Sequence, residues 1–138
     1  MKIIADRPPN FEDIAWAFKG AYGEEVVFAY APNIYYPDAA RGKKLPGELI
    51  AHEAAHIRRQ EEMGVTEWWS RYIEDADFRM EEEIIAHVAE YEFLIANATS
   101  RQQRRGSLKA IGRKLSSPLY RYNLSLKQAM KLLEERSA

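Results

Sequence analysis

Two histidines and a glutamate near the middle of the chain form the pattern His-Glu-x-x-His, written here as His52-Glu53-Ala54-Ala55-His56. The segment from about Glu48 to Met63 is predicted to be a helix. Histidines four residues apart share one helix face, so both imidazoles can reach one metal ion. Glu53 would lie beside the ion, where its carboxylate can act as a general base on a water molecule. The rest of the chain must then bring a further ligand to this helix.

The composition limits what else could bind a metal. The chain has 138 residues, the size of one domain, and no cysteine. Disulfide scaffolds, thiolate nucleophiles and cysteine-based zinc sites are therefore excluded, and a metal must be held by His, Asp or Glu. The net charge of −1 gives no global preference for nucleic acid or for an anionic membrane.

The N-terminal segment Met1–Ala5 contains an apolar run that is too short for a signal peptide. No stretch of the sequence approaches the 18 apolar residues of a membrane span. We therefore expect a soluble protein that stays in the compartment where it is made, by default the cytoplasm.

The predicted elements alternate near the N-terminus and are helical afterwards. Strands are expected at Ile3-Ile4, Glu25–Tyr30 and Asn33–Tyr36, the last at a sheet edge because Pro32 and Pro37 flank it. Helices are expected at 11–21, at 48–63 and from Gly106-Ser107 to Leu115. Three more are expected to begin at a capping residue: a short helix after Thr66, a long one from Phe78 to about Asn97 after Asp77, and a last one after Ser125 to about Arg136. This order predicts an α+β fold in which a small N-terminal sheet of about three strands packs on a mainly helical part.

We expect one domain over residues 1–138. Its sheet-bearing part is 1–46, the helices that carry the metal motif are 47–98, and the basic helical C-terminal part is 99–138. The basic part has nine Lys or Arg residues and no acid between Phe93 and Leu133. Such a segment can dock on nucleic acid or on an acidic partner, although a solvated face packed against the acidic first half explains it as well.

A catalytic zinc needs a third protein ligand and one position left for water. The pattern that supplies a third histidine shortly after the motif fails here, because Ile57-Arg58-Arg59-Gln60-Glu61-Glu62 follows His56. The acid must then come from a later helix, and the helix from Phe78 offers Glu81-Glu82-Glu83.

The position of each acid relative to the apolar stripe of that helix selects one of the three. Glu83 and His87 lie together beside the stripe, which contains Ile84, Val88, Tyr91 and Ile95. Glu83 is the predicted ligand. Glu81 lies on the line of Ile84 and Val88 and stays an alternative, and Glu82 is expected to turn furthest toward solvent. His87 has two interpretations, either support of a ligand or an oxyanion through its ring N–H, or a partly buried ring with a backbone partner.

These residues resemble a known group. Leu49–His56 followed by an acid-bearing helix is similar to the minimal gluzincin type of zinc metallopeptidase, and Glu83-Ile84-Ile85-Ala86-His87 matches its E-x-x-A-[D/N/H] segment. The resemblance implies a zincin-like domain with one Zn²⁺ held by His52, His56 and Glu83. It leaves the role of His87 open, since an acid is common there.

A longer resemblance involves the segments Trp68–Tyr72, Asp77–Glu83 and Leu115–Tyr120, which look like small H-E-x-x-H proteins encoded by tailed bacteriophages. This implies a phage or prophage origin and a bacterial host cytoplasm, with no known substrate.

Three functions follow as hypotheses. The first is a zinc-dependent hydrolase, a peptidase acting on a peptide or protein, with Glu53 as general base and an oxyanion donor among Tyr72, Tyr91, Tyr120 and Tyr122. In this hypothesis the strand at 34–36 could pair with an extended substrate. The second is a structural or interaction protein that binds metal without turnover, for example in a phage assembly. The third makes the basic segment the binding surface.

Overall fold

The computed structural model describes residues 1–117 and 124–137. The strands are β1 (Ile3–Ile4), β2 (Phe28–Tyr30) and β3 (Asn33–Tyr35), the short 3₁₀ helices are η1 (Lys19–Tyr22) and η2 (Pro37–Arg41), and the α-helices are α1 (Phe11–Ala17), α2 (Gly47–Met63), α3 (Val65–Glu74), α4 (Ala76–Ala96), α5 (Arg101–Leu115) and α6 (Leu126–Arg136). The predicted α+β class is confirmed. Within the described residues, none of the helices combines the length and the apolar character that a membrane span needs.

The three strands form one sheet in the order β1-β3-β2, with β1 parallel and β2 antiparallel to β3. The prediction that residues 33–36 form an edge strand is therefore wrong, because β3 is the central strand. Pro32 and Pro37 lie just outside the three-residue ladder, so neither removes a ladder hydrogen bond. The outer edge of β2 is covered at Ala29, whose carbonyl accepts hydrogen bonds from the Gln60 amide at 2.9 Å and the Trp69 indole at 3.0 Å.

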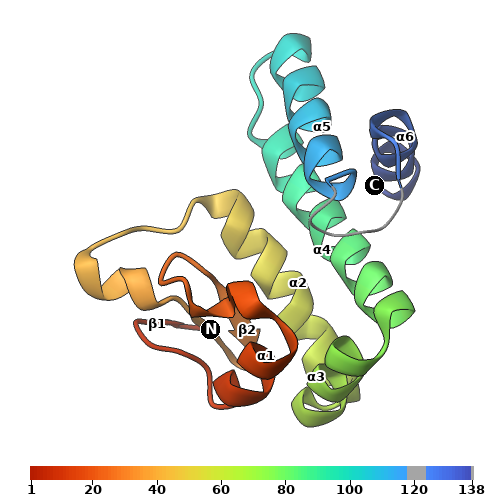
Figure 1. The fold of residues 1–138 in the computed structure, drawn as a ribbon. Coiled ribbons are helices and arrows are strands. Elements are labelled where there is room, and N and C mark those ends of the chain that lie inside the picture. The colour runs from red at the N-terminus through yellow and green to blue at the C-terminus, as the bar shows by residue number, and fades with distance from the viewer. Residues whose placement is uncertain (118–123, 138) are drawn as a thin grey trace.

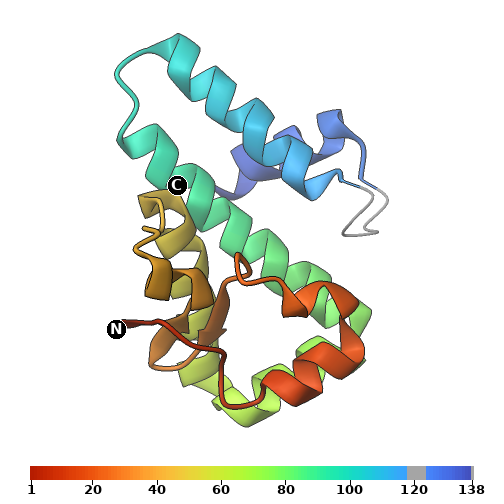
Figure 2. The ribbon, with the colours of Figure 1, turned by 60° about the vertical axis from the view of Figure 1, so that its left-hand side comes forward.

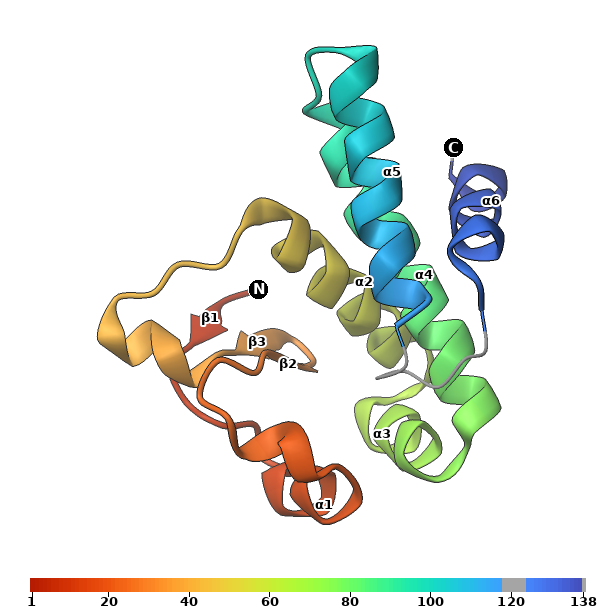
Figure 3. The same ribbon diagram turned by 45° about the horizontal axis from the view of Figure 1, so that its top comes forward.

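The elements are arranged in layers around α2. This helix lies between the sheet and α4, and α5 and α6 pack on α4 beyond it (Figures 1 and 2). One apolar cluster joins α1, β2 and α3, a second joins the sheet to α2, and a third joins α4, α5 and α6. Helix α4 lies against α2 along one side and against α5 and α6 along another (Figure 3). The fold thus sets α4 against the helix that carries the histidines.

Several helix starts differ from their predicted positions. The Asp75 carboxylate, two residues before the expected Asp77, caps α4 by accepting hydrogen bonds from the N–H groups of Asp77 and Phe78. Helix α5 begins after Ser100 and contains Gly106 in its interior. Gly64, with φ of 94°, joins α2 directly to α3, so the turn needs no Thr66 cap. Ser125 caps α6 as predicted, with a complete capping box.

Helix α4 is buried on two faces, and this decides where its acids go. Its apolar face packs on α5 and α6 through Ile84, Val88 and Tyr91. Its other buried face is largely polar, lies toward α2 and α3, and consists of Glu82, Glu83, Ala86, His87 and Glu90. At about 100° per residue these sets form two adjoining stripes. The single apolar stripe seen in the sequence is therefore only half of the buried surface of this helix.

The prediction that Glu82 turns toward solvent is wrong, since this side chain is only 1% exposed. Its carboxylate accepts hydrogen bonds from Arg59 of α2 at 3.1 Å and from the Trp68 indole of α3 at 2.7 Å. Glu82 therefore ties three helices together beside the histidine pair.

We expect Glu82→Ala to lower the free energy of unfolding by about 2 kcal/mol, because a buried indole N–H and a guanidinium lose a charged acceptor. Glu82→Gln keeps one acceptor oxygen and should cost less. Urea unfolding followed by tryptophan fluorescence measures both changes. Equal stability of Glu82→Ala and the unsubstituted protein would contradict this role.

Candidate metal centre

Three side chains from two helices converge where α2 and α4 cross. On α2, His52 and His56 lie one turn apart, with ring centroids separated by 5.0 Å. On α4, Glu83 points between them: its Oε2 lies 2.8 Å from His56 Nε2 and its Oε1 lies 3.5 Å from His52 Nε2. The structure thus brings the predicted ligands His52, His56 and Glu83 together, with both imidazoles presenting the same nitrogen.

The other two acids of the triplet lie elsewhere. Glu81 is exposed and pairs with Arg136 of α6, with an oxygen to nitrogen distance of 2.5 Å. Glu81 thus lies on the side of α4 that faces α6, in line with Ile84 and Val88 as expected, and this side does not contact the histidine pair, so the alternative that Glu81 is the ligand is not supported. Glu82 is occupied by Arg59 and Trp68. Among the three, Glu83 is the acid in contact with the histidine pair.

Glu53 lies beside the pair and is 7% exposed. The metal-binding atoms of His52, Glu53 and His56 lie within 4.8 Å of one another. Burial raises the pKa of the Glu53 carboxyl, and the neighbouring histidines oppose that rise in part. Its Oε2 has no hydrogen-bond partner among the described residues, as expected of an atom that meets a water molecule or a substrate.

Glu90 holds the other side of His52 and was not predicted. Its Oε1 lies 3.0 Å from His52 Nδ1, and its Oε2 pairs with the ammonium of Lys114 from α5. Nδ1 can donate its proton to this carboxylate, which leaves Nε2 facing Glu83; Nε2 donates a proton to Glu83 when the ring is protonated and offers its lone pair to an ion once that proton is lost. The signal in the sequence is the spacing of Glu83, His87 and Glu90 at i, i+4 and i+7, which puts all three on one face of α4.

The charges of the centre are strongly coupled. Burial alone would lower the pKa of His52, but the carboxylates of Glu83 and Glu90 outweigh it and raise this pKa to about 10. Burial likewise opposes ionisation of Glu83, while His56 and His52 hold its pKa well below its usual range. The centre therefore contains an ionised carboxylate that requires a nearby positive charge, either a proton on His52 or a cation in its place.

We expect Glu90→Gln to weaken zinc binding by about 10- to 100-fold, because the carboxylate that orients His52 and raises its basicity is lost. Glu61→Gln is the matched control, since Glu61 is an exposed acid on α2. Competition with a chromophoric chelator measures both affinities. An unchanged affinity of Glu90→Gln would contradict the orienting role.

We also expect zinc binding at pH 7.5 to release about one proton. With a pKa of about 10, His52 is protonated at this pH before the ion binds, and the ion must displace that proton to reach Nε2. The apparent affinity therefore falls as the pH is lowered, by about tenfold per unit. Calorimetry in two buffers that differ in ionisation enthalpy counts the protons, and zero release would contradict the coupling of His52 to its carboxylates.

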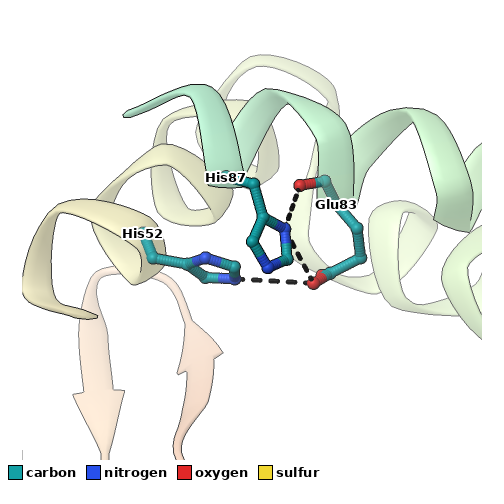
Figure 4. A group of neighbouring side chains, drawn as sticks. All are labelled: His52, Glu83 and His87. Atoms are coloured by element: carbon teal, nitrogen blue, oxygen red, sulfur yellow. Dashed lines mark hydrogen bonds and ion pairs between the residues drawn. The ribbon is translucent and has the colours of Figure 1, made fainter. Parts of the chain in front are cut away.

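His87 of α4 lies next to His52 and Glu83 and is 1% exposed. Its Nδ1 is 2.7 Å from the backbone carbonyl of Glu83, which is the backbone partner of one of its two interpretations. Figure 4 shows its ring between the side chains of Glu83 and His52. The metal-binding atoms of these three residues lie within 4.8 Å of one another. Burial and the nearby His52 lower the pKa of His87 to about 4, so its ring is neutral at pH 7.

One of the four tyrosines considered as oxyanion donors reaches the centre. The Tyr72 hydroxyl donates a hydrogen bond of 3.0 Å to Glu83 Oε2 and its ring stacks on Trp68. Tyr91 lies in the apolar cluster of α4, α5 and α6 instead. Tyr120 and Tyr122 lie outside the described residues. In this arrangement Tyr72 positions the predicted ligand Glu83.

A cleft of about 450 Å³ opens beside the centre. Its lining comes from four parts of the chain: Val27 before β2, Leu49, His52 and Glu53 of α2, His87 and Glu90 of α4, and Arg113, Lys114 and Ser117 at the end of α5. A ligand in this cleft can reach both His52 and Glu53.

The donors fit a borderline divalent ion such as zinc. Two imidazole nitrogens and one carboxylate form the three-residue set of a catalytic zinc site, and a carboxylate orients the first histidine from behind. The Glu53 carboxylate lies close to both histidines, and its Oε2 has no partner among the described residues, which fits a general base beside a zinc site.

Comparison of the chain with family models, with curated proteins and with solved structures finds no match. What the centre does is therefore inferred from its own residues.

Proposed function

We propose that the protein is a zinc-dependent hydrolase that cleaves peptide bonds, a minimal metallopeptidase of the gluzincin type. His52, His56 and Glu83 would hold the ion. The observation that carries this proposal is the convergence of these three side chains, from two helices, next to a buried oxygen of Glu53 that has no hydrogen-bond partner in the described part of the chain.

Each residue has a distinct part in the proposed reaction. When bound, a zinc ion supplies Lewis acidity, which makes water a competent nucleophile at neutral pH and polarises a carbonyl group. Glu53 accepts the proton of the attacking water at Oε2 and returns it to the nitrogen of the leaving amine. Its raised pKa makes it a better base for this transfer than an exposed glutamate. Glu90 fixes the orientation of His52, and Tyr72 fixes that of Glu83.

The cleft supports hydrolysis over purely structural metal binding. It is lined by His52 and Glu53, so a substrate carbonyl can approach the side of the centre on which the general base lies. A metal that serves only to hold helices together has no need of such access.

The proposal is tested with the zinc-loaded protein and a complex mixture of peptides, analysed by mass spectrometry. We expect new termini that disappear with a chelator and return with added zinc. Absence of zinc-dependent cleavage across the mixture would contradict the proposal.

His87 favours a second candidate function, a closed metal site without turnover. Its ring lies close enough to His52 and Glu83 to share an ion with them. Four protein ligands would fill a tetrahedral zinc shell and leave no position for water. If His87 is a ligand, His87→Ala weakens zinc binding strongly; if His52, His56 and Glu83 suffice, the ion stays bound.

We further infer, from the resemblance to small phage proteins, that the protein acts on a peptide or protein in the cytoplasm of a bacterial host. Fractionation of cells expressing a tagged chain tests this location, and recovery in the periplasm would contradict it.

A further inference from the structure

The cleft joins the candidate metal centre to the basic C-terminal part of the chain. Arg113 and Lys114, both in the last turn of α5, line it together with His52 and Glu53. The two cations differ in their partners. Lys114 forms an ion pair with the buried Glu90, whereas the Arg113 guanidinium has no ion pair or hydrogen bond among the described residues. Arg113 is exposed and therefore free to meet a ligand.

The position of α5 relative to the centre is fixed by packing and by charge. Leu108, Ile111 and Leu115 of α5 are buried against α4 and α6. Lys114 reaches the same Glu90 carboxylate that contacts His52 Nδ1. The end of α5 is thus anchored to the metal-binding helices, and Arg113 projects from a rigid element instead of a loop.

The charges of the cleft do not cancel once an ion is bound. Three carboxylates, those of Glu53, Glu83 and Glu90, surround the centre. A divalent ion and the Lys114 ammonium balance these three negative charges. The positive charge of Arg113 is then in excess within the described lining. A cation at the rim of a partly enclosed cleft attracts ligands of opposite charge.

We infer that Arg113 binds a carboxylate of the substrate, so that the cleft selects acidic peptides. This inference rests on the proposed peptide hydrolysis, because it names the substrate class of the same site. The planar guanidinium suits a carboxylate, which it can bind through two parallel hydrogen bonds. The carboxylate has two possible sources, an Asp or Glu side chain or the C-terminus of the peptide.

The test measures binding apart from turnover. It uses the zinc-loaded Glu53→Gln protein and labelled alanine-glycine hexapeptides that carry Asp or Asn at each position in turn, each with a free or an amidated C-terminus. Fluorescence anisotropy gives the dissociation constants. We expect the acidic member of one matched pair to bind about tenfold more tightly than its neutral partner. If the C-terminus is the group bound, the free acid is preferred over the amide wherever Asp is placed.

Two substitutions of Arg113 and one control show whether this preference for acidic peptides depends on Arg113. Arg113→Gln should abolish it, and Arg113→Glu should reverse it in favour of the neutral peptide. Lys109→Gln removes an exposed cation of the same helix that does not line the cleft, and it should leave the preference unchanged. The inference would be overturned if the preference survives Arg113→Gln or if Lys109→Gln reduces it equally. It would also be overturned if acidic and neutral peptides bind equally or if no peptide binds.

The inference and the proposed hydrolysis fail in different ways. Cleavage of neutral and acidic peptides at equal rates by the zinc-loaded unsubstituted protein would overturn the role of Arg113 and leave the hydrolase intact. An Arg113-dependent preference in binding without cleavage of any peptide would support the role of Arg113 and contradict the hydrolase.

Discussion

Glu53→Gln is expected to lower peptide hydrolysis by about 10²- to 10⁴-fold, the range that a positioned general base contributes. The amide keeps the size of the side chain but cannot accept a proton at neutral pH. Because Glu53 lies beside the three predicted ligands and is not one of them, the substituted protein should still bind one zinc ion with little change in affinity. Glu53 Oε2 has no partner in the described structure, so the substitution breaks no hydrogen bond at that atom.

This result is measured as cleavage rate, bound zinc and thermal stability on the same preparation. Glu61→Gln, an exposed acid on the same helix, is the control and should match the unsubstituted protein in all three. Hydrolysis that persists in Glu53→Gln with zinc bound would show that another group activates the water. Loss of zinc together with activity would show that Glu53 is a ligand instead of a base.

Glu83→Ala is expected to weaken zinc binding by more than about 100-fold, the upper end of what loss of a residue that only orients a ligand costs, because it removes one of the three groups proposed to hold the ion. The acidic triplet provides matched controls. Glu81→Ala removes the adjacent exposed acid and should leave the affinity unchanged. Glu82→Ala should mainly lower the free energy of unfolding and change the zinc affinity of the folded protein less, since this residue contacts Arg59 and Trp68.

Chelator competition with the three variants separates these roles. Glu83→Gln provides a second test, since it preserves the volume of the buried side chain while removing its charge. Zinc affinity that is unchanged in both Glu83 variants, or that falls equally in Glu81→Ala, would contradict the assignment of Glu83.

The metal motif and the fold class were accessible from the sequence for physical reasons. An i, i+4 histidine pair on a helix has one geometry, so His52 and His56 share a face in the structure as expected. Segments rich in β-branched and aromatic residues, followed by helical patterns, predicted the α+β order; β1 has its predicted bounds, whereas β2 and β3 are shorter than predicted. Ser125 was recognised because a capping box is a local interaction.

The errors arose where distant segments decide the outcome. Glu82 was expected in solvent because the sequence of α4 shows only one apolar stripe. The second buried face of this helix consists mostly of paired polar groups, so no apolar pattern in the sequence marks it as buried. Glu81 stayed an alternative ligand in the sequence because its partner Arg136 lies 55 residues further along the chain. The central place of β3 depends on pairing with β1, which no local pattern reveals.

Glu90 and Lys114 show a further limit. Neither belongs to a short motif, and their contact joins residues 24 apart in the chain. Lys114 was grouped with the basic C-terminal part, whereas the structure uses it to neutralise a carboxylate that supports the centre. The charge pattern of the sequence could not distinguish this lysine from the exposed Arg113 one residue earlier.

The most direct test of the account is anomalous diffraction at the zinc edge from crystals of the zinc-loaded protein. We expect one ion where α2 and α4 cross, with His52 and His56 nitrogens and a Glu83 oxygen at about 2.0–2.2 Å. An ion held elsewhere, or none at a saturating zinc concentration, would contradict the metal centre and the hydrolase proposed from it.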